Sequence, residues 1–429
     1  MKLHHLPKSS VLVNATQVTR DASQLKQHSK DSISKLLDRR WTLEKPDTKV
    51  HQITLSTEQT RSGFFGNVNF SINSHPKLSE AMMDESYKRP SFYIVRDDLL
   101  HPLVNGNKAR KLDALLPMIE DISGTDVVTC GGVQSAHAAA LAASCAERGL
   151  KSHLLLRGEE PETLTGYNLI SSMYGNSIYV PRSVYAKRDE MLLTHGKAIA
   201  GPSGALVWFT DVLDSFTCIR TTDRKDSEDG KKKVVIVKEG AGDAVALLGI
   251  IRLVQYLSQN HVLGSERPYN FVIDSGTGTT AIGFALGALI LGLPWKITAV
   301  MLADTFEGYK NQENRLVSDF KRFYASDLND IDNALTDKLV HWVHRDNPRK
   351  FGNVLEGEIN ACQQIASQTG ILVDPIYTLA AWELAVQLSQ REHEDGAKVV
   401  MLHTGGTLGM FGLAQRYKSY FSTLKHGLH

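Results

Sequence analysis

The chain has 429 residues, with 48 basic and 47 acidic side chains, a net charge of about +1 and a mean hydropathy of −0.20. This length is enough for two or three domains. The balanced charge argues against binding to nucleic acid or to a membrane surface, and the sequence has no uninterrupted apolar run of the length that crosses a membrane. We therefore expect a globular protein whose partner is a small molecule.

The N-terminal 40 residues are interpreted as an extension that precedes the folded part. Residues 1–20 contain three basic side chains and no acidic one, a composition that resembles a mitochondrial transit peptide. A plain extension on a cytoplasmic protein fits this segment equally well. The four cysteines form no C-x-x-C pair, which argues against zinc and redox motifs and is typical of an intracellular protein. We predict no metal site.

Short apolar strands alternate with helical segments along the rest of the chain. The strand expected in "SFYIVRDDLL" precedes a helix from Leu112 onward, whose apolar residues recur at i, i+3, i+4 and i+7. The same order recurs in "DVVTCGG" and "QSAHAAALAASCAERG", and in "SHLLLRG" and "TGYNLISSMYG". After a charged segment at 221–233, four more strands follow, and all but "KITAVML" are followed by glycines and a helix. This alternation is typical of α/β proteins with parallel sheets.

Three junctions between a strand, glycines and a helix concentrate polar residues: "TCGGVQSAH", "DSGTGTTAIG" and "LHTGGTLG". Ligands of parallel sheets bind beyond the carboxyl ends of the strands, where such junctions lie. In the second junction, the N–H groups and hydroxyls of residues 275–280 could hold a phosphate at a helix N-terminus, although ordinary packing is the alternative. Ser135 is either a helix N-cap or, with the N–H groups of residues 135–137, part of a carboxylate site.

Lys108 is preceded by Asn105, Gly106 and Asn107, residue types that tolerate tight turns. The turn would hold this lysine at the mouth of the helix, whereas cations on a surface helix usually face solvent. A held lysine, a phosphate site and a carboxylate site together indicate pyridoxal 5′-phosphate. The aldehyde of this cofactor needs an amine, and its phosphate needs a helix N-terminus.

Five segments, in order, resemble motifs of the D-cysteine desulfhydrase and 1-aminocyclopropane-1-carboxylate deaminase family: "NGNKARKLD", "GGVQSAH", "SGTGTTAIG", "GILVDPIYT" and "LHTGG". The resemblance covers roughly residues 90–415. Members are fold-type II pyridoxal-phosphate enzymes related to the tryptophan synthase β fold. This implies an α/β homodimer whose chains have two three-layer α/β/α subdomains with mostly parallel sheets. We place the large, cofactor-binding subdomain at 41–105 and 234–429, and the small one at 106–233, ending in the charged segment.

The same resemblance implies roles for individual residues. Lys108 would be the Schiff-base lysine, with Arg110 and Lys111 disfavouring its ammonium form. Thr404 would face the pyridine nitrogen, and Tyr377 would transfer protons or support the ring as a catalytic residue. The cofactor phosphate would bind to Gly276, Thr277, Gly278, Thr279 and Thr280. The substrate carboxylate would bind to Ser135, Ala136 and His137, and Ser135 would also assist catalysis.

Two positions choose between the activities of the family. His137 matches the cysteine-degrading branch, and Thr378 stands where the deaminase branch has a Glu at the pyridine nitrogen. Both indicate a lyase that converts D-cysteine and water to pyruvate, hydrogen sulfide and ammonia by α,β-elimination. Ala136 in place of Asn and Phe351 in place of Tyr keep three alternatives open. These are the cyclopropane deaminase reaction, deamination of another amino acid, and a non-catalytic cofactor-binding protein.

Overall fold

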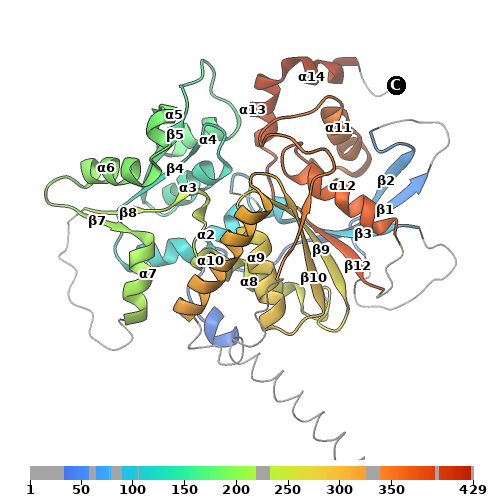
Figure 1. The fold of residues 1–429 in the computed structure, drawn as a ribbon, viewed down its shortest axis with the longest axis horizontal. Helices are drawn as coiled ribbons and strands as arrows, with labels where there is room; N and C mark the ends of the chain where they lie inside the picture. Colours follow the sequence, from blue (N-terminus) through green and yellow to red (C-terminus); the bar gives the residue numbers. More distant parts are fainter. Residues whose placement is uncertain are drawn as a thin grey trace, which may run out of the picture.

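The computed structural model describes residues 33–57, 64–76, 78, 89–104, 106–218, 232–324, 339–391 and 396–426. Two lobes lie side by side, each built around one β-sheet (Figure 1). Most of the expected N-terminal extension and most of the charged segment lie outside the described residues, and so does Asn105 of the predicted turn.

The larger sheet has, within the described residues, seven strands in the order β11-β10-β9-β12-β3-β1-β2. Their bounds are β1 (Val50–Thr57), β2 (Val68–Asn73), β3 (Ser91–Val95), β9 (Tyr269–Ser275), β10 (Trp295–Met301), β11 (His341–His344) and β12 (Lys398–Leu402). The strands from β11 to β3 run parallel, whereas β1 and β2 form an antiparallel edge that the sequence analysis did not predict. The carboxyl ends of β9 and β12 are neighbours, which brings two of the three polar junctions together.

The smaller sheet has, in the same described part of the chain, five parallel strands in the order β6-β5-β4-β8-β7. Their bounds are β4 (Asp126–Gly132), β5 (Lys151–Arg157), β6 (Asn176–Val180), β7 (Ala205–Trp208) and β8 (Lys233–Ile236). Because β8 pairs with β4 and β7, it belongs to the small lobe. The chain therefore returns to the large lobe after residue 236, and not at the boundary of 233 expected from the charged segment.

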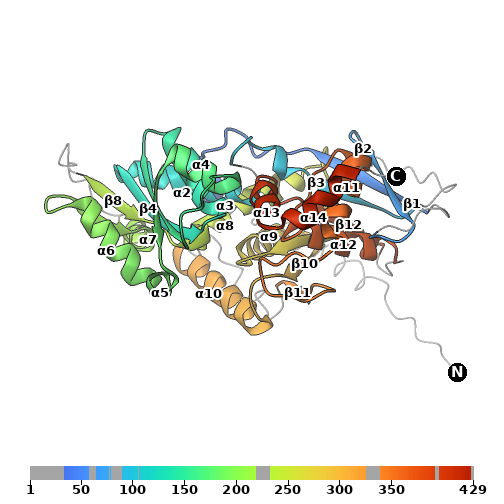
Figure 2. The ribbon, with the colours of Figure 1, turned by 90° about the horizontal axis from the view of Figure 1, so that it is seen from above.

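Helices cover both faces of each sheet, so each lobe has three layers, as predicted. In the small lobe, α2 (Asn107–Asp121), α3 (Ala136–Ala146) and α4 (Gly166–Tyr174) face α5 (Arg182–Tyr185) and α6 (Arg188–Ala200) across the sheet, and α7 (Phe209–Cys218) follows β7. In the large lobe, α8 (Val245–Leu257), α9 (Thr279–Ile290) and α10 (Phe306–Tyr324) face α11 (Glu358–Thr369) and α12 (Thr378–Ser389), and α13 (Gly409–Arg416) and α14 (Lys418–Ser422) follow β12. Figure 2 shows α4 and α6 on opposite sides of β4.

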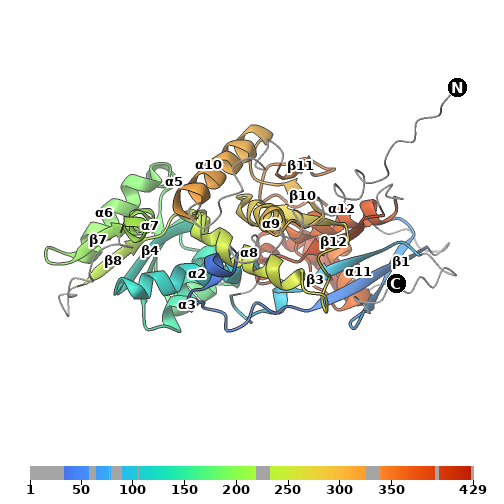
Figure 3. The same ribbon diagram turned by 90° about the horizontal axis from the view of Figure 1, so that it is seen from below.

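One apolar core joins the lobes, because α2 packs against α8 and α8 packs against α9 (Figure 3). The approach is close at Gly249, where an added Cβ would lie 2.0 Å from the carbonyl oxygen of Arg110. By length and composition, the segment Glu239–Leu257 could cross a membrane, but 89% of its apolar window is buried. It is therefore a core helix, and it holds the lysine-bearing helix α2 against the large lobe.

Candidate active site

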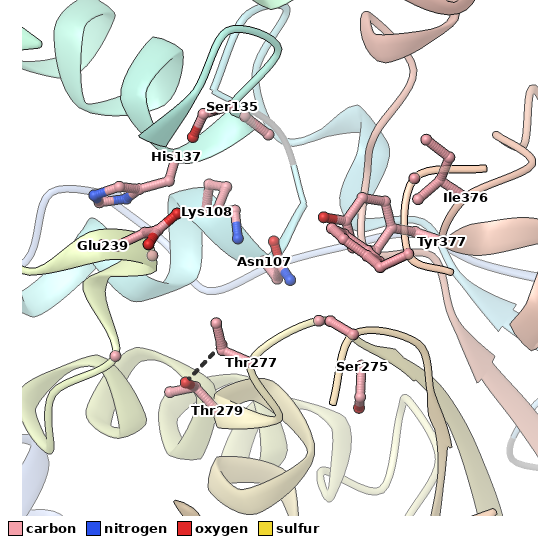
Figure 4. A pocket seen from close by; sticks show the side chains of 18 of the residues that line it. Asn107, Lys108, Ser135, His137, Glu239, Ser275, Thr277, Thr279, Ile376 and Tyr377 are labelled. Atoms are coloured by element: carbon pink, nitrogen blue, oxygen red, sulfur yellow. Dashed lines mark hydrogen bonds between the residues drawn. The ribbon is translucent and has the colours of Figure 1, made fainter. Parts of the chain in front are cut away.

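A cavity of about 890 Å³ lies between the lobes, at the carboxyl ends of β4, β9 and β12 (Figure 4). The residues predicted to bind the cofactor or the substrate, or to act in catalysis, all line it, although they come from both lobes: Lys108, Ser135, Ala136, His137, Gly276, Thr277, Gly278, Thr279, Thr280, Tyr377 and Thr404. The three polar junctions thus form one site.

Lys108 lies in the first turn of α2, which begins five residues before the predicted start at Leu112. Gly106 has a φ of +61°, and a Cβ there would lie 1.8 Å from the carbonyl oxygen of Thr404. The N–H of Asn107 donates to that same oxygen at 3.1 Å. Only glycine permits this contact, which ties the start of α2 to the end of β12. Burial lowers the pKa of Lys108 to about 8, against an opposing effect of Asp274.

The two neighbouring cations have different partners. Both are buried, and Arg110 forms two hydrogen bonds to Asp97, from Nη2 to Oδ1 at 2.8 Å and from Nε to Oδ2 at 3.0 Å. The charge of Arg110 is therefore compensated by Asp97. The largest cause of the lowered pKa of Lys108 is burial. Lys111 instead approaches the glycine-rich loop, with Nζ 3.3 Å from the Thr277 hydroxyl. Burial, and then the charge of Lys108, lowers the pKa of Lys111 well below its usual value.

The loop between β9 and α9 is shaped to expose its backbone N–H groups. Gly278 has a φ of +77°, and a Cβ there would lie 2.9 Å from the ring of Trp342. The hydroxyls of Thr277 and Thr279 lie 3.0 Å apart, while the Ser275 side chain points away from them (Figure 4). In the described part of the chain, the N–H groups of residues 277–280 have no hydrogen-bond acceptor. A helix N-terminus with free N–H groups can hold an anion.

Tyr309, on α10, anchors this loop and was missed by the sequence analysis. Its hydroxyl lies 2.5 Å from the carbonyl oxygen of Ser275 and 2.9 Å from that of Gly276, to which it can donate, and it accepts the N–H groups of Leu302 and Ala303, each at 3.1 Å. An isolated tyrosine on a remote helix carries no local pattern that would reveal such a contact.

Ser135 has the structural role considered for it, because its Oγ accepts the N–H of Ala138 at 3.2 Å as the N-cap of α3. Its own N–H donates to the carbonyl oxygen of Gly132 at 2.9 Å. Among the described residues, the N–H groups of Ala136 and His137 lack an acceptor. The candidate carboxylate site therefore has two free N–H groups, those of Ala136 and His137, whereas the prediction also included the N–H of Ser135.

His137 is buried and neutral, because burial and the charges of Lys108 and Lys111 lower its pKa well below 6.5. The hydroxyl of Thr129 donates to the carbonyl oxygen of Val237 at 2.8 Å, so it accepts from His137 Nε2 at 3.1 Å. Nδ1 is then an acceptor, and it has no partner in the described part of the chain. The imidazole ring cannot donate from Nδ1 to a carboxylate, which leaves the main-chain N–H for that role.

Tyr377 forms the wall opposite Lys108 (Figure 4). A Cβ on Gly276 would lie 3.2 Å from its ring, and Phe351 packs edge-on against it with 5.5 Å between the ring centroids. Burial, and then Asp374, raises the Tyr377 pKa, so the phenol is neutral.

Thr378 does not face the cavity, contrary to the prediction. It is fully buried, its hydroxyl donates to Asp374 Oδ2 at 2.9 Å, and it accepts the Asp374 N–H at 2.7 Å. Because the Thr378 hydroxyl bonds to Asp374, the identity of residue 378 does not indicate which group would face the pyridine nitrogen of a cofactor.

Asp274 is a second residue that the sequence analysis missed. It is 3% exposed, lines the cavity at the end of β9, and accepts a 2.6 Å hydrogen bond from the Thr404 hydroxyl. Burial, helped by Asp374, raises its pKa to about 7, while Thr404 and Lys108 act in the opposite direction. An acidic residue inside the apolar strand "YNFVIDS" was the available signal.

The chain is 52% identical over 386 residues to an Oryza sativa subsp. japonica protein provisionally named D-cysteine desulfhydrase 2, mitochondrial, covering 89% of this chain and 94% of the relative. It is 24% identical over 329 residues to the Arabidopsis thaliana bifunctional D-cysteine desulfhydrase/1-aminocyclopropane-1-carboxylate deaminase, mitochondrial, covering 74% and 73% of the two chains. A crystal structure of an ACC deaminase homologue has the same fold, with a TM-score of 0.59 and 23% identity over 77% of this chain and 89% of that one. No family model matches the chain.

Proposed function

Because the chain belongs to the D-cysteine desulfhydrase family of fold-type II pyridoxal-phosphate lyases, we propose that it binds pyridoxal 5′-phosphate in the cavity and degrades D-cysteine. The products are pyruvate, hydrogen sulfide and ammonia, with one water consumed. The observation that carries the proposal is that a half-buried amine, an anion-binding helix N-terminus and a second helix N-terminus line the same cavity.

The residues fit the cofactor in charge and in space. The amine of Lys108 would bind the aldehyde covalently, and its lowered pKa supplies the neutral form that this reaction needs. The free N–H groups of residues 277–280 would hold the phosphate, with Lys111 beside them. When bound, the cofactor would withdraw electrons from the α-carbon of the substrate. Gly276 leaves space beside Tyr377 for a planar ring.

The small lobe would orient the substrate. The N–H groups of Ala136 and His137 would bind its carboxylate at the positive end of α3. Lys108, once released from the aldehyde, would take the α-proton on Nζ. The neutral phenol of Tyr377 can donate a proton on the opposite wall. Thiolate would leave from the β-carbon, and water would complete the conversion to pyruvate and ammonia.

The test is a reconstitution of the purified protein with the cofactor. We expect absorbance near the edge of the visible range, borohydride labelling of Lys108, and equal amounts of sulfide and pyruvate from D-cysteine. Lys108→Ala should lose all three. A labelled protein that degrades no amino acid would instead support the non-catalytic alternative.

Deamination of 1-aminocyclopropane-1-carboxylate is the second candidate, because the Arabidopsis relative is named for both activities. It would release 2-oxobutanoate, which the same reactions can be assayed for. We expect little, since Phe351 offers no phenol near the substrate.

We also propose a mitochondrial location, since both plant relatives carry that word in their names. A homodimer is the proposed assembly. The helices α4 and α13 pack against each other. Their exposed apolar side chains offer a surface for dimerisation: Leu169, Met173, Tyr174 and Phe411. Light scattering of the purified protein would test the assembly.

A further inference from the structure

We propose that Asp274 is a positioning residue that acts through Thr404 to keep the pyridine nitrogen of the cofactor protonated. This rests on the proposed binding of pyridoxal phosphate, and it adds a function for a carboxyl group that neither the sequence motifs nor the relatives' names assign. It also places a carboxyl group behind the ring nitrogen, which the comparison of Thr378 with the Glu of the deaminase branch did not predict.

A hydroxyl group has a single proton to donate. Thr404 Oγ1 lies 2.6 Å from Asp274 Oδ1 and donates to it, and both side chains are buried. With its proton used in this way, the Thr404 oxygen can only accept from a third group. A pyridine nitrogen facing this oxygen would therefore have to carry a proton in order to form a hydrogen bond with it.

The placement of the ring nitrogen follows from the other two attachments. The amine of Lys108 lies on the α2 side of the cavity, and the anion-binding N–H groups of residues 277–280 lie at the start of α9. The ring nitrogen, which is para to the aldehyde-bearing carbon, would then need a polar partner on another wall of the cavity, and the ends of β9 and β12 form such a wall. Asp274 and Thr404 are polar groups of that wall, and both line the cavity.

The charges around Asp274 are consistent with this role. Lys108, on α2, favours its ionised form, whereas Asp374, before α12, disfavours it. Tyr377 faces the same space as a neutral phenol. A protonated ring nitrogen hydrogen-bonded to Thr404 would add a further positive charge near Asp274 and would favour its ionised form.

The experiment is ¹⁵N NMR of the protein reconstituted with pyridoxal phosphate labelled at the ring nitrogen. In the wild type, we expect the chemical shift of a pyridinium at neutral pH. Asp274→Asn should move the shift to that of a neutral pyridine, because an amide cannot stabilise the cation. Thr404→Val, which keeps the carboxyl group but removes the bridge, should do the same, and Thr404→Ser should restore the wild-type shift.

A wild-type shift typical of neutral pyridine would overturn the proposal, even if Asp274→Asn failed to fold. An unchanged pyridinium shift in both Asp274→Asn and Thr404→Val would also overturn it. Either result would leave the proposed function standing, provided that borohydride still labels Lys108. Failure of the wild type to bind the cofactor would reject the proposed function itself, and this inference with it.

Discussion

Lys108 should react with pyridoxal phosphate at neutral pH far faster than an ordinary lysine. Only the neutral amine attacks an aldehyde, and burial lowers the pKa from 10.5 to about 8. Since each pKa unit is a tenfold change in protonation, about one amine in ten is neutral at pH 7, compared with about one in 3,000 for a free lysine. The expected advantage in neutral amine is therefore about 300-fold.

The measurement is the rate at which the cofactor-free protein becomes covalently labelled, sampled across about pH 6 to 10 by borohydride trapping and peptide mass spectrometry. The rate should rise with pH and level off above about pH 8, because Lys108 is then neutral. An N-acetyl-lysine reference should keep rising toward its own pKa. Asp274→Asn is a matched variant: the carboxylate raises the Lys108 pKa, so its removal should move the midpoint to lower pH.

Two results would refute this reasoning. A midpoint near 10.5 would mean that burial does not perturb the amine. A label on Lys111, whose pKa is also lowered, would mean that the wrong lysine has been assigned to the aldehyde.

Three further changes test other parts of the structure. Lys111→Met should weaken pyridoxal phosphate binding by about tenfold or more, the value of a lost charge-assisted hydrogen bond, without weakening the binding of phosphate-free pyridoxal in equilibrium dialysis. Thr378→Val should lower the free energy of unfolding by about 1–3 kcal/mol in urea titrations, because it removes a hydroxyl that supports the buried carboxyl of Asp374; an unchanged midpoint would contradict that role. Arg110→Met should cost about 3–5 kcal/mol, since it leaves Asp97 buried without its partner, and Asp97→Asn in the same chain should recover part of the loss.

Local patterns were sufficient to predict the elements that carry the chemistry. The strand–glycine–helix junctions before α3 and α9 have short apolar runs, glycines and polar residues in consecutive positions, so their geometry is largely a local matter. The antiparallel edge of β1 and β2 was not predicted. This edge is joined to the rest of the sheet by pairs such as Ile53 on β1 and Phe92 on β3, which are far apart in sequence, and no pattern within either segment specifies the partner.

The motif containing Lys108 illustrates the same division. A lysine after Asn-Gly-Asn was predicted to be held at the mouth of a helix, and Lys108 does line the cavity there, because turn chemistry is encoded by adjacent residues. The partners of the neighbouring cations, Arg110 and Lys111, could not be predicted from adjacent residues. Arg110 is neutralised by a carboxylate thirteen positions earlier, and Lys111 contacts a hydroxyl 166 positions later, so only the folded chain decides which of them reaches the cavity.

The sequence by itself determined the α/β class and the family, and it predicted that Lys108 and the glycine-rich loop belong to the site, because each of these depends on residue types at short spacing. Only the tertiary structure decided the electrostatics of the site. Thr378 faces Asp374 and not the cavity, and Asp274 meets Thr404 across 130 positions of chain. Hydrogen-bond partners and pKa values depend on which groups are buried together, and burial is a property of the packed lobes.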